Sequence, residues 1–247
     1  MGNTMKAVFI SIFFLFLFHA NFTFAEEQNP KNYLVFKGGM YFPQHDDLKE
    51  YSDGFNGEFY YGAYLGKHFS SEIGVGYFKS DGKSKISGTV SGVPLTFSTE
   101  DTLKVFDILY NIKLIYPIGK LELFAGPGIG IYFAKVNTVV TGTQGPTSVS
   151  AACEAIGDWN TAFGYHLLAG GNYNINANWF IGVEGKYFWA KTKDPIIPLS
   201  GSPFSTPGCP NITLIPDSGN PESITVGGPF GSHLDGVTAT ASFGWRF

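Results

Sequence analysis

The chain has 247 residues and a formal net charge of −4 at pH 7, so its charge does not suggest a nucleic-acid partner. Only 15% of the residues are charged, against about 25% in a typical soluble domain. Aromatic residues make up 17%, and 32 residues are glycine. This composition excludes an ordinary soluble surface and requires another way of hiding apolar side chains from water.

The first segment, residues 1–25, has the features of a cleaved secretory signal peptide. One positive charge, Lys6, precedes an apolar run from Ala7 to Phe18, and a small-residue cleavage site ends at Ala25. The alternative is a membrane anchor, but the run is shorter than the ~20 residues of a spanning helix. No later stretch is apolar enough for such a helix. We therefore expect residues 26–247 to form one exported domain.

Apolar residues recur with period 2 through the rest of the chain, which predicts eight β-strands. The predicted strands are Tyr33–Pro43, Gly57–Phe69, Ile73–Ser80, Leu103–Tyr116, Leu121–Val136, Ala162–Ile175, Trp179–Lys191 and Leu234–Phe247. Most exceed the five or six residues of an average strand. They are long enough for a tilted membrane crossing, which needs about 9–11 residues.

The expected connections alternate in length. Tight turns at 70–72, 117–120 and 176–178 alternate with polar segments at roughly 44–56, 81–102, 137–161 and 192–233. Structureless loops this long count against a compact soluble domain. They are typical of outer-membrane barrels, which have short periplasmic turns and long extracellular loops. An even strand count also returns the C-terminus to the periplasmic side.

The two faces of each strand differ in kind. Trp179, Ile181 and Val183 share one face of their strand, whereas Gly, Ser, Thr and Asn predominate on the opposite faces. A soluble lipocalin-like barrel is the alternative fold, but it would show charge to water. Small residues instead suit the interior of a narrow closed barrel. The sequence predicts a closed eight-stranded antiparallel transmembrane β-barrel, with an aromatic girdle at Tyr116, Tyr173, Trp179 and Trp189.

The chain resembles the small outer-membrane β-barrel families of Gram-negative bacteria, of the OmpA transmembrane domain, OmpX and OmpW types. The resemblance rests on "SFGWRF", "LELFAGPGIGIYFAKV" and "GYHLLAGGNYNINANWFIGVEGKYFW". It implies that Phe243, Trp245 and Phe247 in the last strand are the signal read by the barrel-assembly machinery. The chain differs from full-length OmpA in that we expect no peptidoglycan-binding domain after the barrel.

Charged residues with inward parity form the first candidate site. They are Lys37, Glu58, Asp107, Lys113, Glu122, Glu184, Lys186 and Arg246. Buried charges must be paired, and four acids with four bases permit pairing. We interpret the set as an ion-pair network that fills the barrel. The alternative is that some of these pairs gate a narrow conduit.

Outward lysines form the second candidate site. Lys79, Lys104, Lys135 and Lys191 share the parity of the lipid-facing residues, and the last three lie at the loop ends of their strands. Lysine there extends its ammonium to the headgroup level. The hypothesis is contact with lipid and lipopolysaccharide phosphates. Generic interfacial positioning is the alternative.

The remaining motifs suggest no chemistry. Cys153 and Cys209 lie in the third and fourth loops, and the oxidising periplasm favours a disulfide between them. "GPGIG" (126–130) lacks the following helix that a phosphate-binding loop needs. The acidic first loop around His45 offers no positioned base. We expect no cofactor, no metal site and no enzymatic activity.

The sequence therefore predicts a protein of the Gram-negative outer membrane with a structural or surface-interaction role, such as adhesion or antigen presentation. The runner-up is a narrow, porin-like channel for small or hydrophobic solutes, as OmpW-like resemblance would imply, and an outer-membrane enzyme is a distant third. Expected partners are outer-membrane lipid, lipopolysaccharide, the barrel-assembly machinery and a host or phage surface ligand. We expect a monomer.

Overall fold

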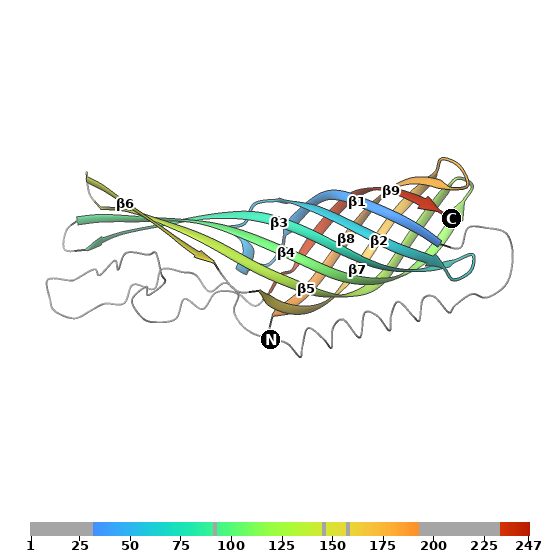
Figure 1. Ribbon diagram of the computed structural model, residues 1–247, viewed down its shortest axis with the longest axis horizontal. Helices are drawn as coiled ribbons and strands as arrows, with labels where there is room; N and C mark the ends of the chain where they lie inside the picture. The colour runs from blue at the N-terminus through green and yellow to red at the C-terminus, as the bar shows by residue number, and fades with distance from the viewer. Residues whose placement is uncertain (1–31, 91–92, 145–146, 157–158, 193–232) are drawn as a thin grey trace.

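The computed structural model describes residues 32–90, 93–144, 147–156, 159–192 and 233–247. Most of these residues lie in antiparallel β-strands (Figure 1). The strands are β1 (Asn32–Pro43), β2 (Gly54–Tyr64), β3 (Phe69–Val90), β4 (Val93–Ile118), β5 (Leu121–Gln144), β6 (Thr147–Ile156), β7 (Asn160–Asn174), β8 (Trp179–Thr192) and β9 (Gly236–Arg246). A single turn of 3-10 helix, η1 (Asp46–Leu48), follows β1.

Eight of the strands close into a barrel. β1 pairs with both β2 and β9, and β4 pairs with both β3 and β5. The circuit then runs from β5 through β7 and β8 back to β9. The predicted closed eight-stranded barrel is therefore confirmed. β6 is not part of this circuit. It pairs with β5 from Asn137 onward, past Ala134, where the pairing of β5 with the first residue of β7 stops.

Short turns gather at one end of the barrel. They connect β2 to β3 at 65–68, β4 to β5 at 119–120 and β7 to β8 at 175–178. Gly66 and Gly119 adopt φ values of 113° and 62°, a region that favours glycine. The turn predicted at 70–72 is wrong, because those residues belong to β3. The physical signal for this turn is Gly66, four residues earlier.

Long strands extend from the other end. β3, β4 and β5 contain 22, 26 and 24 residues, against 11 to 15 in the other barrel strands. Together with β6 they project past the barrel (Figure 1). The prediction of loops at 81–102 and 137–161 is therefore wrong, because most residues of these segments continue the sheet. The pairing of β3 with β4 extends as far as Val90 and Val93. Their β-branched residues favour strand despite their polarity. Most of the fourth predicted loop lies outside the described residues.

The barrel is apolar outside and mixed inside. Phe36, Tyr116, Ile129, Phe163 and Val183 point outward, and each is at least 60% exposed. Side chains of opposite parity are buried, including the aromatic residues Tyr60, Phe78 and Tyr132. Such an exterior is suited to hydrocarbon, where a closed barrel leaves no unpaired sheet edge. Among the described residues, no helix is long and apolar enough to cross a membrane.

Candidate functional sites in the barrel

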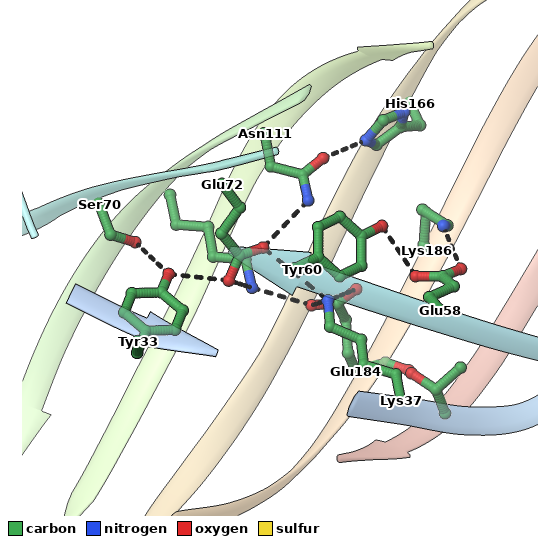
Figure 2. A network of polar contacts seen from close by, with 12 residues as sticks. Tyr33, Lys37, Glu58, Tyr60, Ser70, Glu72, Asn111, His166, Glu184 and Lys186 are labelled. Atoms are coloured by element: carbon green, nitrogen blue, oxygen red, sulfur yellow. Dashed lines mark hydrogen bonds and ion pairs between the residues drawn. The ribbon is translucent and has the colours of Figure 1, made fainter. Parts of the chain in front are cut away.

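Six charged side chains meet in the middle of the barrel and form what we call the ion-pair network. Its members are Lys37 (β1), Glu58 (β2), Glu72 (β3), Lys113 (β4), Glu184 and Lys186 (β8). Figure 2 shows five of them by label, converging from strands around the barrel. All six are nearly inaccessible to solvent. Three acids and three bases leave the network neutral when all are ionised.

Two carboxylates and two ammonium groups form the centre of this network. Lys37 Nζ lies 2.7 Å from Glu184 Oε2 and 3.9 Å from Glu72 Oε2. Lys113 Nζ lies 2.7 Å from Glu72 Oε1 and 3.1 Å from Glu184 Oε2. Each base thus bridges both acids. A separate close pair joins Lys186 to Glu58.

Neutral side chains complete the hydrogen bonding of these carboxylates (Figure 2). The Tyr33 hydroxyl donates to Glu72 Oε1 at 2.8 Å, and the Tyr60 hydroxyl donates to Glu58 Oε2 at 2.8 Å. Asn111 donates through Nδ2 to Glu72 Oε2 at 3.0 Å. The Oδ1 of Asn111 lies 2.6 Å from His166 Nε2, so this arrangement requires a proton on Nε2. Such saturation is what buried ions need to be tolerated.

A second charged cluster lies nearer the short turns. Arg246 places one guanidinium nitrogen 2.8 Å from Glu122 Oε2 and donates through Nε to the Tyr64 hydroxyl at 3.0 Å. Asn174 donates to the other oxygen of Glu122 at 2.9 Å. The guanidinium also stacks on Phe180, with 4.6 Å between its carbon and the ring centroid. This end of the interior is therefore filled by paired charge and aromatic rings.

Aromatic side chains cover the ion-pair network on the loop side. Phe188 lies 5.8 Å from Tyr41, 5.7 Å from Phe78 and 5.3 Å from Tyr132, measured between ring centroids. We call these four residues the aromatic layer. All four are at most 1% exposed. The network is thus enclosed between the aromatic layer and the Arg246 cluster.

Two interior residues depart from the predicted pairing. Asp107 is 2% exposed, and its Oδ1 has no hydrogen-bond partner among the described residues. Glu72 was absent from the predicted set, because its segment was expected to turn. With Glu72 added to the predicted inward residues, that set contains five acidic and four basic side chains. Inward parity, continued backward from Gly76 and Gly74, would have identified it.

Glycines provide space for the large interior side chains. A Cβ on Gly74 would lie 2.2 Å from the Tyr60 ring, and one on Gly128 would lie 2.1 Å from His166 Nε2. The "GPGIG" segment continues β5 as strand, and its middle glycine accommodates His166. These positions thus fit close packing inside the barrel.

Aromatic residues cluster on the outside near the short turns. Trp179 lies 5.0 Å from Phe243 and 6.0 Å from Trp245, and Trp245 lies 4.9 Å from Phe247, measured between ring centroids. The remaining girdle residues Tyr116, Tyr173 and Trp189 also face outward, Trp189 only partly exposed. Toward the other end of β8, Tyr165 stacks on Trp189 with 5.1 Å between their ring centroids.

The four outward lysines divide into a group of three and one apart. Lys104 is the direct cross-strand neighbour of both Lys79 and Lys135. Lys191, on β8, faces Phe163 of β7 instead.

Of the two cysteines, Cys153 lies in β6 opposite Val140 of β5. Cys209 lies outside the described residues, so the disulfide stays a prediction.

A closed eight-stranded barrel with an apolar exterior, short turns at one end and long strands at the other defines an integral outer-membrane β-barrel. A family model for the outer membrane protein beta-barrel domain matches residues 10–247. The chain belongs to this family and is a protein of the Gram-negative outer membrane.

Solved structures of small outer-membrane barrels are similar to the chain over most of its length. Ail, the attachment invasion locus protein of Yersinia pestis, is 12% identical, with 89% of this chain and 100% of that chain covered and a TM-score of 0.40. The N-terminal β-barrel domain of Pseudomonas aeruginosa OprF is 11% identical, with 89% and 100% covered and a TM-score of 0.35. Neisserial surface protein A is 8% identical, with 87% and 97% covered and a TM-score of 0.37. A comparison with curated proteins finds no match.

Proposed function

We propose that this outer-membrane barrel has a structural or surface-interaction role, with a filled interior and without catalytic activity. The observation that carries the proposal is the enclosure of the ion-pair network. Buried side chains from five strands form ion pairs in the barrel interior, some between neighbouring strands and some between strands that are not paired with each other. The aromatic layer covers them. A role in solute passage would favour an open interior. An eight-stranded barrel has just enough interior space for side chains to fill.

The surface role is supported by the strands that project beyond the barrel. From Ser80 to Val90, β3 continues for ten residues, or about 33 Å of extended strand, paired throughout with β4. β5 and β6 continue the same sheet. A sheet of this size is unnecessary for crossing the membrane, whereas it would hold a recognition surface at a distance from the lipid. Host or phage ligands are the partners that such a surface would meet.

Surface labelling on intact cells tests this orientation. A short acceptor peptide for enzymatic biotinylation is inserted between residues 91 and 92, and the matched control carries it between Gly119 and Lys120. The proposal expects extracellular ligase to label the first position only. Labelling of the 119–120 turn without labelling at 91–92 would contradict it. Heat-modifiable electrophoretic mobility shows whether each variant is folded.

A narrow channel is the second candidate, favoured by one specific observation. Asp107 Oδ1, the Tyr132 hydroxyl and His166 Nδ1 are buried without a hydrogen-bond partner among the described residues. Polar groups of this kind can be hydrated by interior water. Liposome swelling in small sugars separates the candidates. The filled barrel predicts the swelling rate of protein-free liposomes, and a faster rate would support the channel.

The assembly role inferred from the resemblance is also part of this proposal. Phe243, Trp245 and Phe247 lie on the exposed face of the last described strand segment. Replacing Phe247 with Ala should slow membrane insertion in cells while leaving refolding into detergent intact. An equal defect in both settings would instead indicate lost packing against Trp245.

A further inference from the structure

Three outward lysines lie side by side across three strands, and we call them the lysine row. Lys79 of β3 pairs in register with Lys104 of β4, which pairs in register with Lys135 of β5. All three point away from the interior, like the apolar residues that precede them toward the short turns. Neighbouring strands are about 4.8 Å apart, so the row is about 10 Å wide. This alignment could not be predicted from the spacing of the lysines in the sequence, because it depends on the register between the strands.

The row lies at the edge of the hydrocarbon layer. The outward positions two residues closer to the short turns are Tyr77, Phe106 and Phe133, with ring centroids of the last two 6.2 Å apart. From the girdle residue Tyr116, Lys104 is twelve residues away, or about 40 Å of strand and about 28 Å of membrane normal at a 45° tilt. The apolar band is about 25 Å tall. With the orientation proposed above, in which the long strands project outside the cell, the lysines therefore reach the headgroups of the outer leaflet.

The charges of the row are not balanced by the residues that the structure describes. Like charges directly opposite each other destabilise a sheet. Lys79 has a partner, with its Nζ 3.0 Å from Asp81 Oδ2, and Thr102 donates to the other oxygen of that carboxylate at 2.8 Å. Lys135 lies over the Trp159 ring at 5.9 Å, which supplies no charge. Among the described residues, one paired carboxylate beside three ammonium groups leaves an excess of positive charge.

From this placement we infer that the lysine row binds the phosphate groups of a phosphorylated lipid headgroup in the outer leaflet, that is, of lipopolysaccharide. The row is wide enough to bind more than one phosphate through charge-assisted hydrogen bonds. The aromatic residues beneath it would contact the acyl chains of the same lipid. Lys191 is not part of this site, because Phe163 occupies the neighbouring position on β7. The inference rests on the proposed orientation of the barrel, but it concerns the lipid-facing surface and does not depend on what fills the interior.

The test compares lipopolysaccharide binding by two triple variants of the full chain folded in detergent. Lys79→Gln/Lys104→Gln/Lys135→Gln removes the row. Lys49→Gln/Lys67→Gln/Lys120→Gln removes the same charge from exposed positions in the first loop and in two short turns. Titration with fluorescently labelled lipopolysaccharide measures affinity, and heat-modifiable mobility confirms folding. The double variant Lys104→Gln/Lys135→Gln keeps the Lys79–Asp81 pair and provides a second test should the first triple fail to fold.

We expect the row variant to bind about 10- to 100-fold more weakly, given the contribution of each basic residue near an anionic surface. The control triple should stay within about twofold of the wild type. Enzymatic removal of the lipid phosphates should weaken wild-type binding as much as loss of the row does. Equal affinity for all variants, or an equal loss in the control triple, would overturn the inference. Displacement by millimolar inorganic phosphate would also overturn it, because it would indicate a general anion site.

Discussion

The Nζ atom of Lys113 lies 2.7 Å from Oε1 of Glu72, and both side chains are almost completely buried inside the barrel. The same ammonium reaches Glu184 at 3.1 Å. Lys113 therefore links β4 to its neighbour β3 and, across the barrel interior, to β8. Removing either partner would leave a buried charge without its compensation. Substitutions in this pair therefore measure how much the interior ion pairs contribute to the free energy of unfolding.

Breaking the Lys113–Glu72 pair should destabilise the barrel strongly. We expect Glu72→Gln and Lys113→Met each to lower the free energy of unfolding by about 3–5 kcal/mol, as for other buried pairs that lose one member. The combined variant should be less destabilised than the sum by about 0.5–3 kcal/mol. Urea unfolding in lipid vesicles, followed by tryptophan fluorescence, measures all three values.

The matched control for this prediction is the exposed Lys83–Glu100 pair, whose Nζ and Oε1 atoms are 2.8 Å apart. Glu100→Gln should change the free energy of unfolding little, because water and salt screen exposed pairs. Equal effects of Glu72→Gln and Glu100→Gln would show that the interior pair does not hold the strands together.

Gly244 should tolerate no side chain, because the ring of Phe180 occupies the space beside it. A Cβ there would lie 2.0 Å from the ring, whereas a Cβ on Gly185 would meet nothing within 4 Å. We expect Gly244→Ala to cost about 1–3 kcal/mol of unfolding free energy through overpacking, and Gly185→Ala to cost none. Adding Phe180→Leu to Gly244→Ala should restore part of the loss. Indistinguishable unfolding curves for the two alanine variants would refute the packing described for this end of the barrel.

Asp81 should titrate at a lower pH than an ordinary aspartate. Partial burial raises the pKa of this carboxyl, but hydrogen bonds from Lys79 and Thr102 outweigh burial and hold it below the usual 3.8. A lowered folded-state pKa means that the stabilisation is fully present above pH 3.8. It is lost as the pH falls through the folded-state value. Carboxyl chemical shifts measured by NMR across this range report the midpoint directly.

Replacing Lys79 with Gln should move the Asp81 midpoint upward, toward 3.8. Lys49→Gln removes a lysine from the first loop, whose ammonium contacts Asp46 instead, and should leave the midpoint unchanged. An unchanged midpoint in the Lys79 variant would mean that the Lys79–Asp81 contact does not persist in solution.

Alternation along the sequence was enough to predict the barrel and the sides of most of its charged residues, but not of Glu72. Period 2 assigns a side chain to one face of its strand without knowledge of the neighbouring strands. Lys37 and Glu184 could therefore be placed inside the barrel and Lys104 outside it. Register depends on hydrogen bonds between strands that lie far apart in the chain. For that reason the Lys79–Lys104–Lys135 alignment and the bridging by Lys113 emerged only from the structure.

The errors of prediction have local causes. Ser70, Ser71 and Glu72 look like a turn because they are polar, yet Ser70 and Glu72 face inward, where the barrel interior is polar too. The turn falls instead at Gly66, whose φ of 113° identifies it physically. The extension of β3 and β4 was missed because polar strands outside the membrane need no apolar alternation.

Single-channel recording of folded protein comprising residues 26–247 in a planar bilayer tests directly whether the barrel interior is filled. Heat-modifiable mobility of the same preparation establishes that the inserted protein is folded. The enclosed ion-pair network predicts a silent bilayer with no discrete current steps. Reproducible openings, weakened or altered by Glu72→Gln or Lys113→Met, would contradict the filled interior and establish the network as the gate of a conducting channel.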